Sequence, residues 1–316
     1  MMKKPAGRNV IDTGKFGQYP EAVIGNDSLM LKVTALGATV RSLRFEGTET
    51  ILGYRTPEEY LNGSCYIGAV IGRVASRIGN STMRIDGTEY PLRPNENGNH
   101  LHGGPYAFDK REWEMETVTE RAVRFTLFSP DGDNGYPGNL TAQVTYTLSE
   151  NELRIDLEGD SDADTVYGPT SHMYFNLGGS GNVLDAELQI NADRYLVMGE
   201  GNIPTGIAPC DATFDFRSMR RIGTNIDHCF VVRDEHMMCA RRDSIQVDLY
   251  SDYPGLVVYT GEFLKDGFSP NAGLAAEPGF YPDAVNHPEY PSPVLRKSDH
   301  FHKYIRYVFS RVTENG

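Results

Sequence analysis

The fold class is decided by residues 140–148, which read Leu-Thr-Ala-Gln-Val-Thr-Tyr-Thr-Leu. Apolar side chains occupy every second position, and Thr or Gln occupies each position between them. Successive side chains of a strand point to opposite faces, so this period of two predicts a half-buried antiparallel strand. A polar segment, 149–152, follows, and then Leu153, Ile155 and Leu157 alternate with charged residues. The two stretches together predict a β-hairpin with one solvated face.

The same alternation recurs in residues 31–35, 186–192, 245–249 and 305–309. The 33 Gly and 18 Pro supply turns between such segments, so the pattern predicts many short antiparallel strands. The best helix signal is Thr56-Pro57-Glu58-Glu59, which combines an N-cap residue, an early Pro and acids in the first turn, and it supports one or two turns. No linker, repeat or low-complexity run divides the chain. The predicted architecture is therefore all-β, with one large antiparallel β-sandwich domain over residues 1–316.

The composition is that of a globular protein, with a formal net charge of −13 over 316 residues. Diffuse negative charge repels phosphate backbones and anionic membrane surfaces, so we expect neither a nucleic-acid nor a membrane partner. No apolar stretch reaches the length that spans a bilayer, and no apolar segment follows the basic N-terminal start, which favours a cytoplasmic location. The four cysteines are widely spaced, which favours buried free thiols over a disulfide framework.

Several common catalytic chemistries have no support in the sequence. His100 and His102, and again His300 and His302, have the spacing of paired ligands on a strand, but no further ligands follow at a zinc-like spacing. The acids at 160, 162 and 164 lack the Gly and Glu that complete an EF-hand loop. No G-x-S-x-G elbow occurs, and no G-x-G-x-x-G follows a strand and opens a helix. We therefore expect no metal site and no dinucleotide site, which leaves His, Glu, Asp and Arg side chains for proton transfer and hydroxyl binding.

Polar clusters at the ends of the predicted strands resemble, in order along the chain, the motifs of the aldose 1-epimerase (galactose mutarotase) family. The segments that carry the resemblance are Gly72-Arg73 with Arg77-Ile78, Leu101-His102-Gly103-Gly104, 131–138 (Asp-Gly-Asp-Asn-Gly-Tyr-Pro-Gly), 172–177 (His-Met-Tyr-Phe-Asn-Leu), Pro204-Thr205-Gly206, 214–217 (Phe-Asp-Phe-Arg), 227–230 (Asp-His-Cys-Phe), Tyr259-Thr260-Gly261, and Glu277 with 282–286 (Pro-Asp-Ala-Val-Asn). Chance would have to reproduce both the residues and their order, so the ordered set is specific.

The resemblance implies a large all-β supersandwich of the galactose mutarotase type, without metal or organic cofactor. It implies an enzyme that interconverts the α and β anomers of a free aldohexose such as glucose or galactose. Carried over residue by residue, it makes Glu277 the general base for the anomeric hydroxyl and His172 the general acid for the ring oxygen. His102 would hydrogen-bond the sugar and support developing charge, and Arg73 and Asp227 would bind ring hydroxyls.

Two positions depart from the family pattern and leave the preferred aldose open. Ser76 stands where the motif commonly has Asn, and Gly279 stands where many members have Gln. Arg77 and His100 are expected to pack or brace loops. Two other functions remain open at this point: a hexose-6-phosphate 1-epimerase, which needs a local basic pocket, and a non-catalytic sugar-binding protein, which would have lost the acid or the base. The expected partner is a small sugar, and the chain is expected to be a monomer or a homodimer.

Overall fold

The predicted hairpin lies in the largest sheet of the molecule. The computed structural model describes residues 10–312, and in it β13 (Leu140–Ser149) and β14 (Glu152–Ser161) pair antiparallel, with Leu148 opposite Leu153. Alternate side chains of both strands are buried, as the period of two predicts. The all-β fold class and this hairpin are therefore confirmed.

Three antiparallel sheets form the body of the molecule, and short two-stranded pairs accompany them. In sheet order, the nine-stranded sheet consists of β11 (Glu114–Thr119), β12 (Ala122–Ser129), β13, β14, β28 (His300–Arg311), β24 (Ile245–Ser251), β23 (His236–Arg242), β18 (Glu187–Ile190) and β21 (Arg220–Arg221). The six-stranded sheet consists of β17 (Tyr174–Phe175), β26 (Leu274–Gly279), β25 (Gly255–Tyr259), β22 (Asp227–Val232), β19 (Ala192–Met198) and β20 (Pro204–Pro209). The five-stranded sheet consists of β1 (Val10–Phe16), β2 (Tyr19–Gly25), β3 (Leu29–Thr34), β4 (Thr39–Phe45) and β5 (Thr48–Glu49). The short pairs are β6 (Val70–Ile71) with β16 (Thr170–Ser171), β7 (Arg77–Ile78) with β10 (His100–Leu101), β8 (Thr82–Ile85) with β9 (Thr88–Pro91), and β15 (Thr165–Val166) with β27 (Val294–Leu295).

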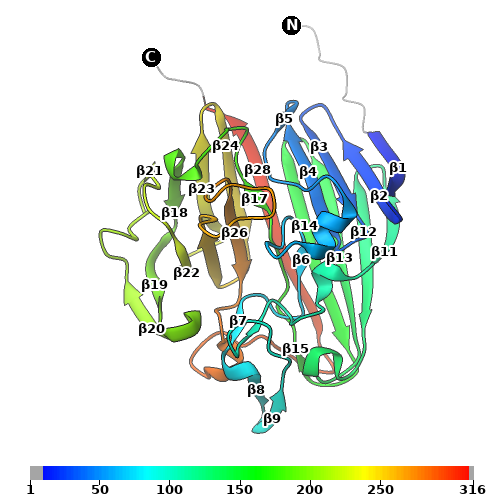
Figure 1. Ribbon diagram of the computed structural model, residues 1–316, viewed down its shortest axis with the longest axis vertical. Helices are drawn as coiled ribbons and strands as arrows, with labels where there is room; N and C mark the ends of the chain where they lie inside the picture. The colour runs from blue at the N-terminus through cyan, green and yellow to red at the C-terminus, as the bar shows by residue number, and fades with distance from the viewer. Residues whose placement is uncertain (1–9, 313–316) are drawn as a thin grey trace, which may run out of the picture.

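The hydrophobic core joins all three sheets. One cluster contains Leu31 of β3, Val144 of β13, Ala276 of β26 and Ile305 of β28, and each of these side chains is fully buried. In Figure 1 the blue strands β3 and β4 lie in front of the green strands β13 and β14, and buried side chains of both sheets belong to this one cluster. Removing apolar surface of several sheets from water is the main stabilising contribution to such a fold.

Helical structure is sparse. Over residues 10–312 the one α-helix is α1 (Pro57–Asn62), and it begins as the sequence predicts: the Thr56 hydroxyl accepts from the Glu59 N–H, and the Glu59 carboxylate accepts from the Thr56 N–H. Short 3₁₀ turns lie at η1 (Gly79–Ser81), η2 (Phe108–Lys110), η3 (Asp133–Gly135), η4 (Val183–Asp185), η5 (Glu200–Asn202) and η6 (Ala284–Asn286). None of the helices in this range has the length and apolar character needed to cross a membrane.

All four cysteines are free thiols, and Cys65, Cys229 and Cys239 are buried, whereas Cys210 is half-buried. The expectation of buried free thiols therefore holds for Cys65, Cys229 and Cys239, whereas the Cys210 thiol is free but only half-buried. The assignment of residues 1–316 to one domain stays a prediction, and its two ends, 1–9 and 313–316, lie outside the described residues.

Candidate active site

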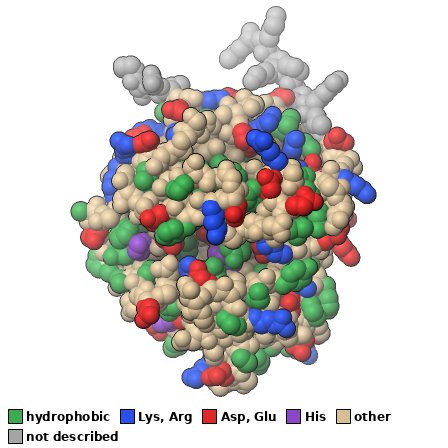
Figure 2. Space-filling view, viewed as in Figure 1, with side chains coloured by type: hydrophobic (Ala, Val, Ile, Leu, Met, Phe, Trp, Pro, Cys, Tyr) green, Lys and Arg blue, Asp and Glu red, His purple; other side chains and the backbone are tan. Residues whose placement is uncertain are grey.

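A cavity of about 560 Å³ opens on the molecular surface, within the size range of small-molecule sites. In Figure 2, acidic, basic and histidine side chains gather around a hollow near the middle of the visible face. Four of the five predicted site residues, His102, His172, Asp227 and Glu277, line the cavity together, although they are far apart in the sequence. The fifth, Arg73, does not line it.

The register of three central strands sets one wall of the cavity. Glu277 of β26 is opposite Val257 of β25, and Val257 is opposite Cys229 of β22. In the next row of the same face, Asp227 is opposite Tyr259. Paired residues share a face of a sheet, and so do residues two apart, so these five side chains line the cavity as a group. Strand pairing therefore places two carboxylates on one surface.

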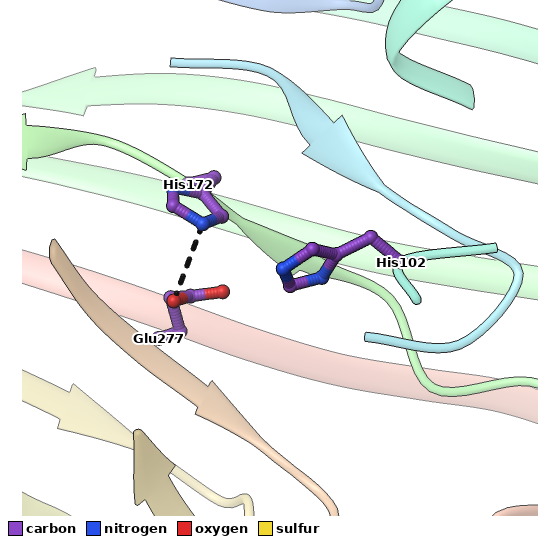
Figure 3. Close-up of side chains that lie close together, drawn as sticks. All are labelled: His102, His172 and Glu277. Carbon is purple, nitrogen blue, oxygen red and sulfur yellow. Dashed lines mark ion pairs between the residues drawn. The ribbon is translucent and has the colours of Figure 1, made fainter. Parts of the chain in front are cut away.

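His172 and Glu277 form a buried pair in this cavity. The Nε2 atom of His172 lies 3.4 Å from a carboxylate oxygen of Glu277, as Figure 3 shows, and the two residues are only 3% and 5% exposed. Burial disfavours the charged form of each group, so it raises the pKa of Glu277 to about 8 and lowers the pKa of His172 to about 4. Asp227 raises the Glu277 pKa further, and Arg77 opposes this effect. Between about pH 4 and about pH 8 the pair holds one proton, which belongs to the pair rather than to either residue.

His102 presents an N–H group toward this pair. Its Nδ1 accepts a hydrogen bond of 3.1 Å from the backbone N–H of Ser76. Burial, together with the neighbouring His172 and Arg77, holds the pKa of His102 well below its usual range, so the ring is neutral. A neutral ring whose Nδ1 accepts carries its proton on Nε2. Figure 3 shows the ring directed toward the other two side chains, so His102 is a fixed hydrogen-bond donor inside the cavity.

The trio His102, His172 and Glu277 matches a metal-ligand set in residue type, with one ligand atom of each within 4.8 Å of the others. The surrounding hydrogen bonds do not fit that role. A ligating histidine usually donates its other N–H to an acceptor. Here Nδ1 of His102 accepts from Ser76, and the buried Nδ1 of His172 has no hydrogen-bond partner within residues 10–312. The arrangement suits proton transfer and hydrogen bonding better than metal ligation.

A second polar group in the cavity consists of Asp227, Arg77 and Glu96. Asp227 opens β22, and its Oδ2 accepts a hydrogen bond of 3.3 Å from the Asn202 side chain. Arg77 donates from Nε at 2.5 Å and from Nη2 at 2.9 Å to the two carboxylate oxygens of Glu96. Ionised side chains held in this way form strong, directional hydrogen bonds with hydroxyl groups.

Comparison with known proteins identifies the family. A family model described as Aldose 1-epimerase matches residues 20–308. The chain belongs to the aldose 1-epimerase family. It is similar to the galactose mutarotase of Mus musculus, with 37% identity over 333 aligned positions that cover 93% of this chain and 97% of the mouse protein. It is also similar to the aldose 1-epimerase of Escherichia coli (strain K12), with 37% identity over 90% of this chain and 93% of the bacterial protein.

Solved structures agree with this assignment. A GalM/aldose epimerase homologue from C. elegans has a TM-score of 0.87 and 29% identity, and the match covers 98% of this chain and 100% of that chain. A galactose 1-epimerase from Lactobacillus acidophilus NCFM has a TM-score of 0.86 and 28% identity, and the match covers 97% of this chain and 99% of that chain. The galactose mutarotase-like fold is confirmed, and the chain is an aldose 1-epimerase, an isomerase. The alternative of a non-catalytic sugar-binding protein is therefore set aside.

Arg73 lies outside the epimerase cavity, and the structure corrects the expectation that it binds sugar hydroxyls. The residue is 2% exposed, and each of its three guanidinium nitrogens donates to buried oxygens. The acceptors are the side chains of Ser129 and Thr165 and the backbone carbonyls of Ser129, Pro130, Pro137 and Gly138. These bonds occupy the N–H groups of all three guanidinium nitrogens. Arg73 therefore braces the 129–138 segment and has no donor left for a sugar.

We expect Arg73→Met to lower the free energy of unfolding by about 3 kcal/mol or more, because it leaves several buried acceptors without a donor. The folded fraction should keep a near-normal KM for sugar. Denaturant unfolding and a KM measured on folded protein check both statements. Arg84→Met is the matched control, because Arg84 pairs with Glu89 on the exposed surface and its loss should change stability little. A raised KM with unchanged stability would restore the sugar-contact role of Arg73.

The two departures from the family pattern fall in different places. Ser76 lines the cavity, and its φ of +65° lies in the left-handed region, where Asn is more common than Ser. Its backbone N–H holds His102 whichever side chain it carries. Gly279 does not line the cavity, and a Cβ atom there would meet nothing within 4 Å. Of the two, Ser76 is the departure that changes the cavity surface.

His100 braces a loop as expected, because its ring nitrogens bond to the Arg93 carbonyl and to the Tyr136 hydroxyl, each at 2.7 Å. Arg77 does more than brace a loop, since it lines the cavity. The G-R-x-x-x-R-I segment offers two arginines, and the one that lines the cavity is Arg77 rather than the predicted Arg73. Glu96 was missed altogether, because a single glutamate in a polar loop carries no sequence signal.

Proposed function

We propose that this aldose 1-epimerase interconverts the α and β anomers of a free aldohexose such as glucose or galactose by general acid–base catalysis. The observation that carries the proposal is the buried pair of Glu277 and His172, 3.4 Å apart in the cavity. The reaction removes a proton from one oxygen of the anomeric centre and delivers a proton to the other. An adjacent acid and base that share one proton meet both demands.

The forward reaction starts from the form of the pair in which the shared proton is on His172 and Glu277 is ionised. The Glu277 carboxylate then takes the proton from the hydroxyl on C1. The electron pair of that O–H bond forms the C1=O bond, the bond between C1 and the ring oxygen breaks, and the ring oxygen takes the proton of His172. Rotation about the C1–C2 bond presents the opposite face of the aldehyde to the ring oxygen. Reclosure runs the steps in reverse, with His172 as base and Glu277 as acid, so the pair regains its starting proton count.

The neighbouring side chains would bind and polarise the sugar. His102 would donate its Nε2–H to the oxygens at the reacting centre, where charge develops. Asp227 would accept from a ring hydroxyl, and Arg77 would donate to another through the nitrogen that Glu96 leaves free. The assignment of Arg77 replaces that of Arg73, because Arg77 reaches the cavity and Arg73 does not.

The charges in the cavity favour a neutral sugar over a hexose 6-phosphate. Its cations are Arg77 and Lys265, and Arg77 is already paired with Glu96. A further acid, Asp227, faces the same space and would repel a phosphate. Comparing kcat/KM for glucose and glucose 6-phosphate tests this choice. A large preference for the phosphate would favour the hexose-6-phosphate alternative instead.

We expect a bell-shaped dependence of kcat/KM on pH, because the active pair holds one proton. As pH falls toward about 4, where burial places the pKa of His172, the pair gains a second proton and no base remains. As pH rises through about 8, where burial places the pKa of Glu277, the pair loses its proton and no acid remains. Initial rates, corrected for buffer catalysis at each pH, check the shape. A flat profile across this interval would contradict the shared-proton scheme.

The direct test of the function is polarimetry on freshly dissolved α-D-glucose and α-D-galactose, with and without the protein. The protein should accelerate the approach to an unchanged final rotation. Comparing the two initial rates then gives the sugar preference. No acceleration with either sugar, from protein whose circular dichroism shows it to be folded, would refute the free-hexose proposal. The monomeric or dimeric state and the cytoplasmic location stay predictions.

A further inference from the structure

Glu96 is a charged residue of the cavity that the acid–base scheme does not use. It lies in the loop between β9 and β10, where its backbone exchanges hydrogen bonds of 3.1 and 2.8 Å with Asn99. Its side chain is 29% exposed, and that of its partner Arg77 is 16% exposed. Both line the cavity, so their ion pair is part of the wall that a sugar would meet.

Glu96 engages one edge of the Arg77 guanidinium. Its two oxygens accept from Nε at 2.5 Å and from Nη2 at 2.9 Å, which is the two-bond geometry that fixes the plane of the group. Within residues 10–312 the third nitrogen, Nη1, makes no hydrogen bond. Glu96 thus occupies the Nε–Nη2 edge of Arg77 and matches its charge, and it leaves the N–H groups at the Nη1 end, in a fixed plane, for a ligand.

The charge balance around the cavity depends on Glu96. Arg77 and Lys265 are the cations, and Glu96, Asp227 and Glu277 are the acids. Burial raises the pKa of Glu277, so this group tends to keep its proton at neutral pH. Glu96 and Asp227 are then the carboxylates that offset the two cations. Without Glu96, the Nε–Nη2 edge of Arg77 and its uncompensated charge would be free to bind a phosphate through two bonds.

We propose that Glu96 is a specificity-determining positioning residue: it turns Arg77 from a phosphate receptor into a hydrogen-bond donor for uncharged sugars. The inference rests on the proposed free-sugar function and names the residue that enforces it. Glu96 acts through Arg77 and takes no part in proton transfer. Removing its charge exposes the guanidinium to anions, whereas shortening it by one methylene keeps the charge in place.

The test compares the wild type with Glu96→Gln, Glu96→Asp and Glu89→Gln. Glu89 is the matched control, because it also pairs with an arginine, Arg84, but on the exposed surface. Inorganic phosphate is the probe, and its dissociation constant is measured by calorimetry alongside kcat/KM for glucose and for glucose 6-phosphate. We expect Glu96→Gln to bind phosphate about tenfold more tightly and to gain a similar factor in the ratio of glucose 6-phosphate to glucose turnover. Glu96→Asp and Glu89→Gln should stay close to the wild type.

Lower glucose turnover by Glu96→Gln, without tighter phosphate binding, would overturn the proposal, because it would mean that Glu96 only supports the loop. Equally tight phosphate binding by the wild type would also overturn it. Calorimetry reports on Arg77 independently of turnover. A wild type that fails to accelerate glucose mutarotation would therefore refute the proposed function while the phosphate comparison still decides the role of Glu96.

Discussion

Glu277→Gln should lower kcat by about 10³-fold or more, since it removes the base that takes the anomeric proton. The amide has nearly the shape of the carboxyl group but cannot accept that proton, and the reverse step loses its acid for the same reason. His172, His102 and the cavity walls remain in place. Polarimetric rates with and without the variant, after subtraction of the spontaneous reaction, measure the loss.

The stability of this variant separates a catalytic role from a structural one. Burial raises the pKa of Glu277 from 4.5 to about 8, so the folded protein keeps a proton that the unfolded chain releases in this interval. The wild type therefore loses stability from this group as pH rises from about 4.5 to about 8, and Gln removes that dependence. We expect Glu277→Gln to be at least as stable as the wild type at neutral pH. Near-normal turnover, or loss of activity caused by unfolding, would argue against Glu277 as the base.

Local pattern was sufficient where neighbours in the sequence are neighbours in space. The strands β13 and β14 follow from alternation and a polar turn, and α1 follows from the Thr56 cap and the Glu59 side chain three residues later. Both features depend on contacts within one short segment. The order of the motifs was enough to name the family and to select Glu277, His172, His102 and Asp227, all of which reach one cavity.

Arg73 and Arg77 show that the sequence alone does not predict which arginine reaches the cavity. They stand four residues apart in one motif, and each could serve as a hydroxyl donor. The choice is made by distant acceptors: carbonyls of the 129–138 segment surround Arg73, whereas Glu96 holds Arg77 in the cavity. Propensity and spacing carry no information about such long-range partners, so only the folded structure shows which arginine is free to meet a ligand.

The cavity wall depends on long-range pairing in the same way. Glu277 and Asp227 face one space because β26, β25 and β22 pair in a particular register. A shift of one residue would turn either carboxylate toward the core. Alternation predicts which residues of a strand share a face, but it does not identify the partner strands or their register, so the sequence alone could not place these two groups together.

His172→Asn should lower kcat by about 10³-fold, because the ring oxygen then lacks a positioned acid as the ring opens. The pH dependence should change as well. In the wild type, activity falls as pH rises through about 8, because the pair loses its proton. In the variant the residual activity depends on ionised Glu277 alone, so it should rise over the same interval. Initial rates of the two proteins on either side of this pH give slopes of opposite sign.

The opposite slopes distinguish this scheme from two simpler ones. If His172 only bound the sugar, its loss would raise KM and leave the falling alkaline limb in place. If Glu277 supplied both protons without a partner, His172→Asn would turn over at a near-normal rate. A shared proton predicts neither outcome, because the 3.4 Å contact makes the ionisation of each group depend on the other. The variant's alkaline limb therefore tests whether His172 and Glu277 act as one unit, which a loss of kcat by itself would not reveal.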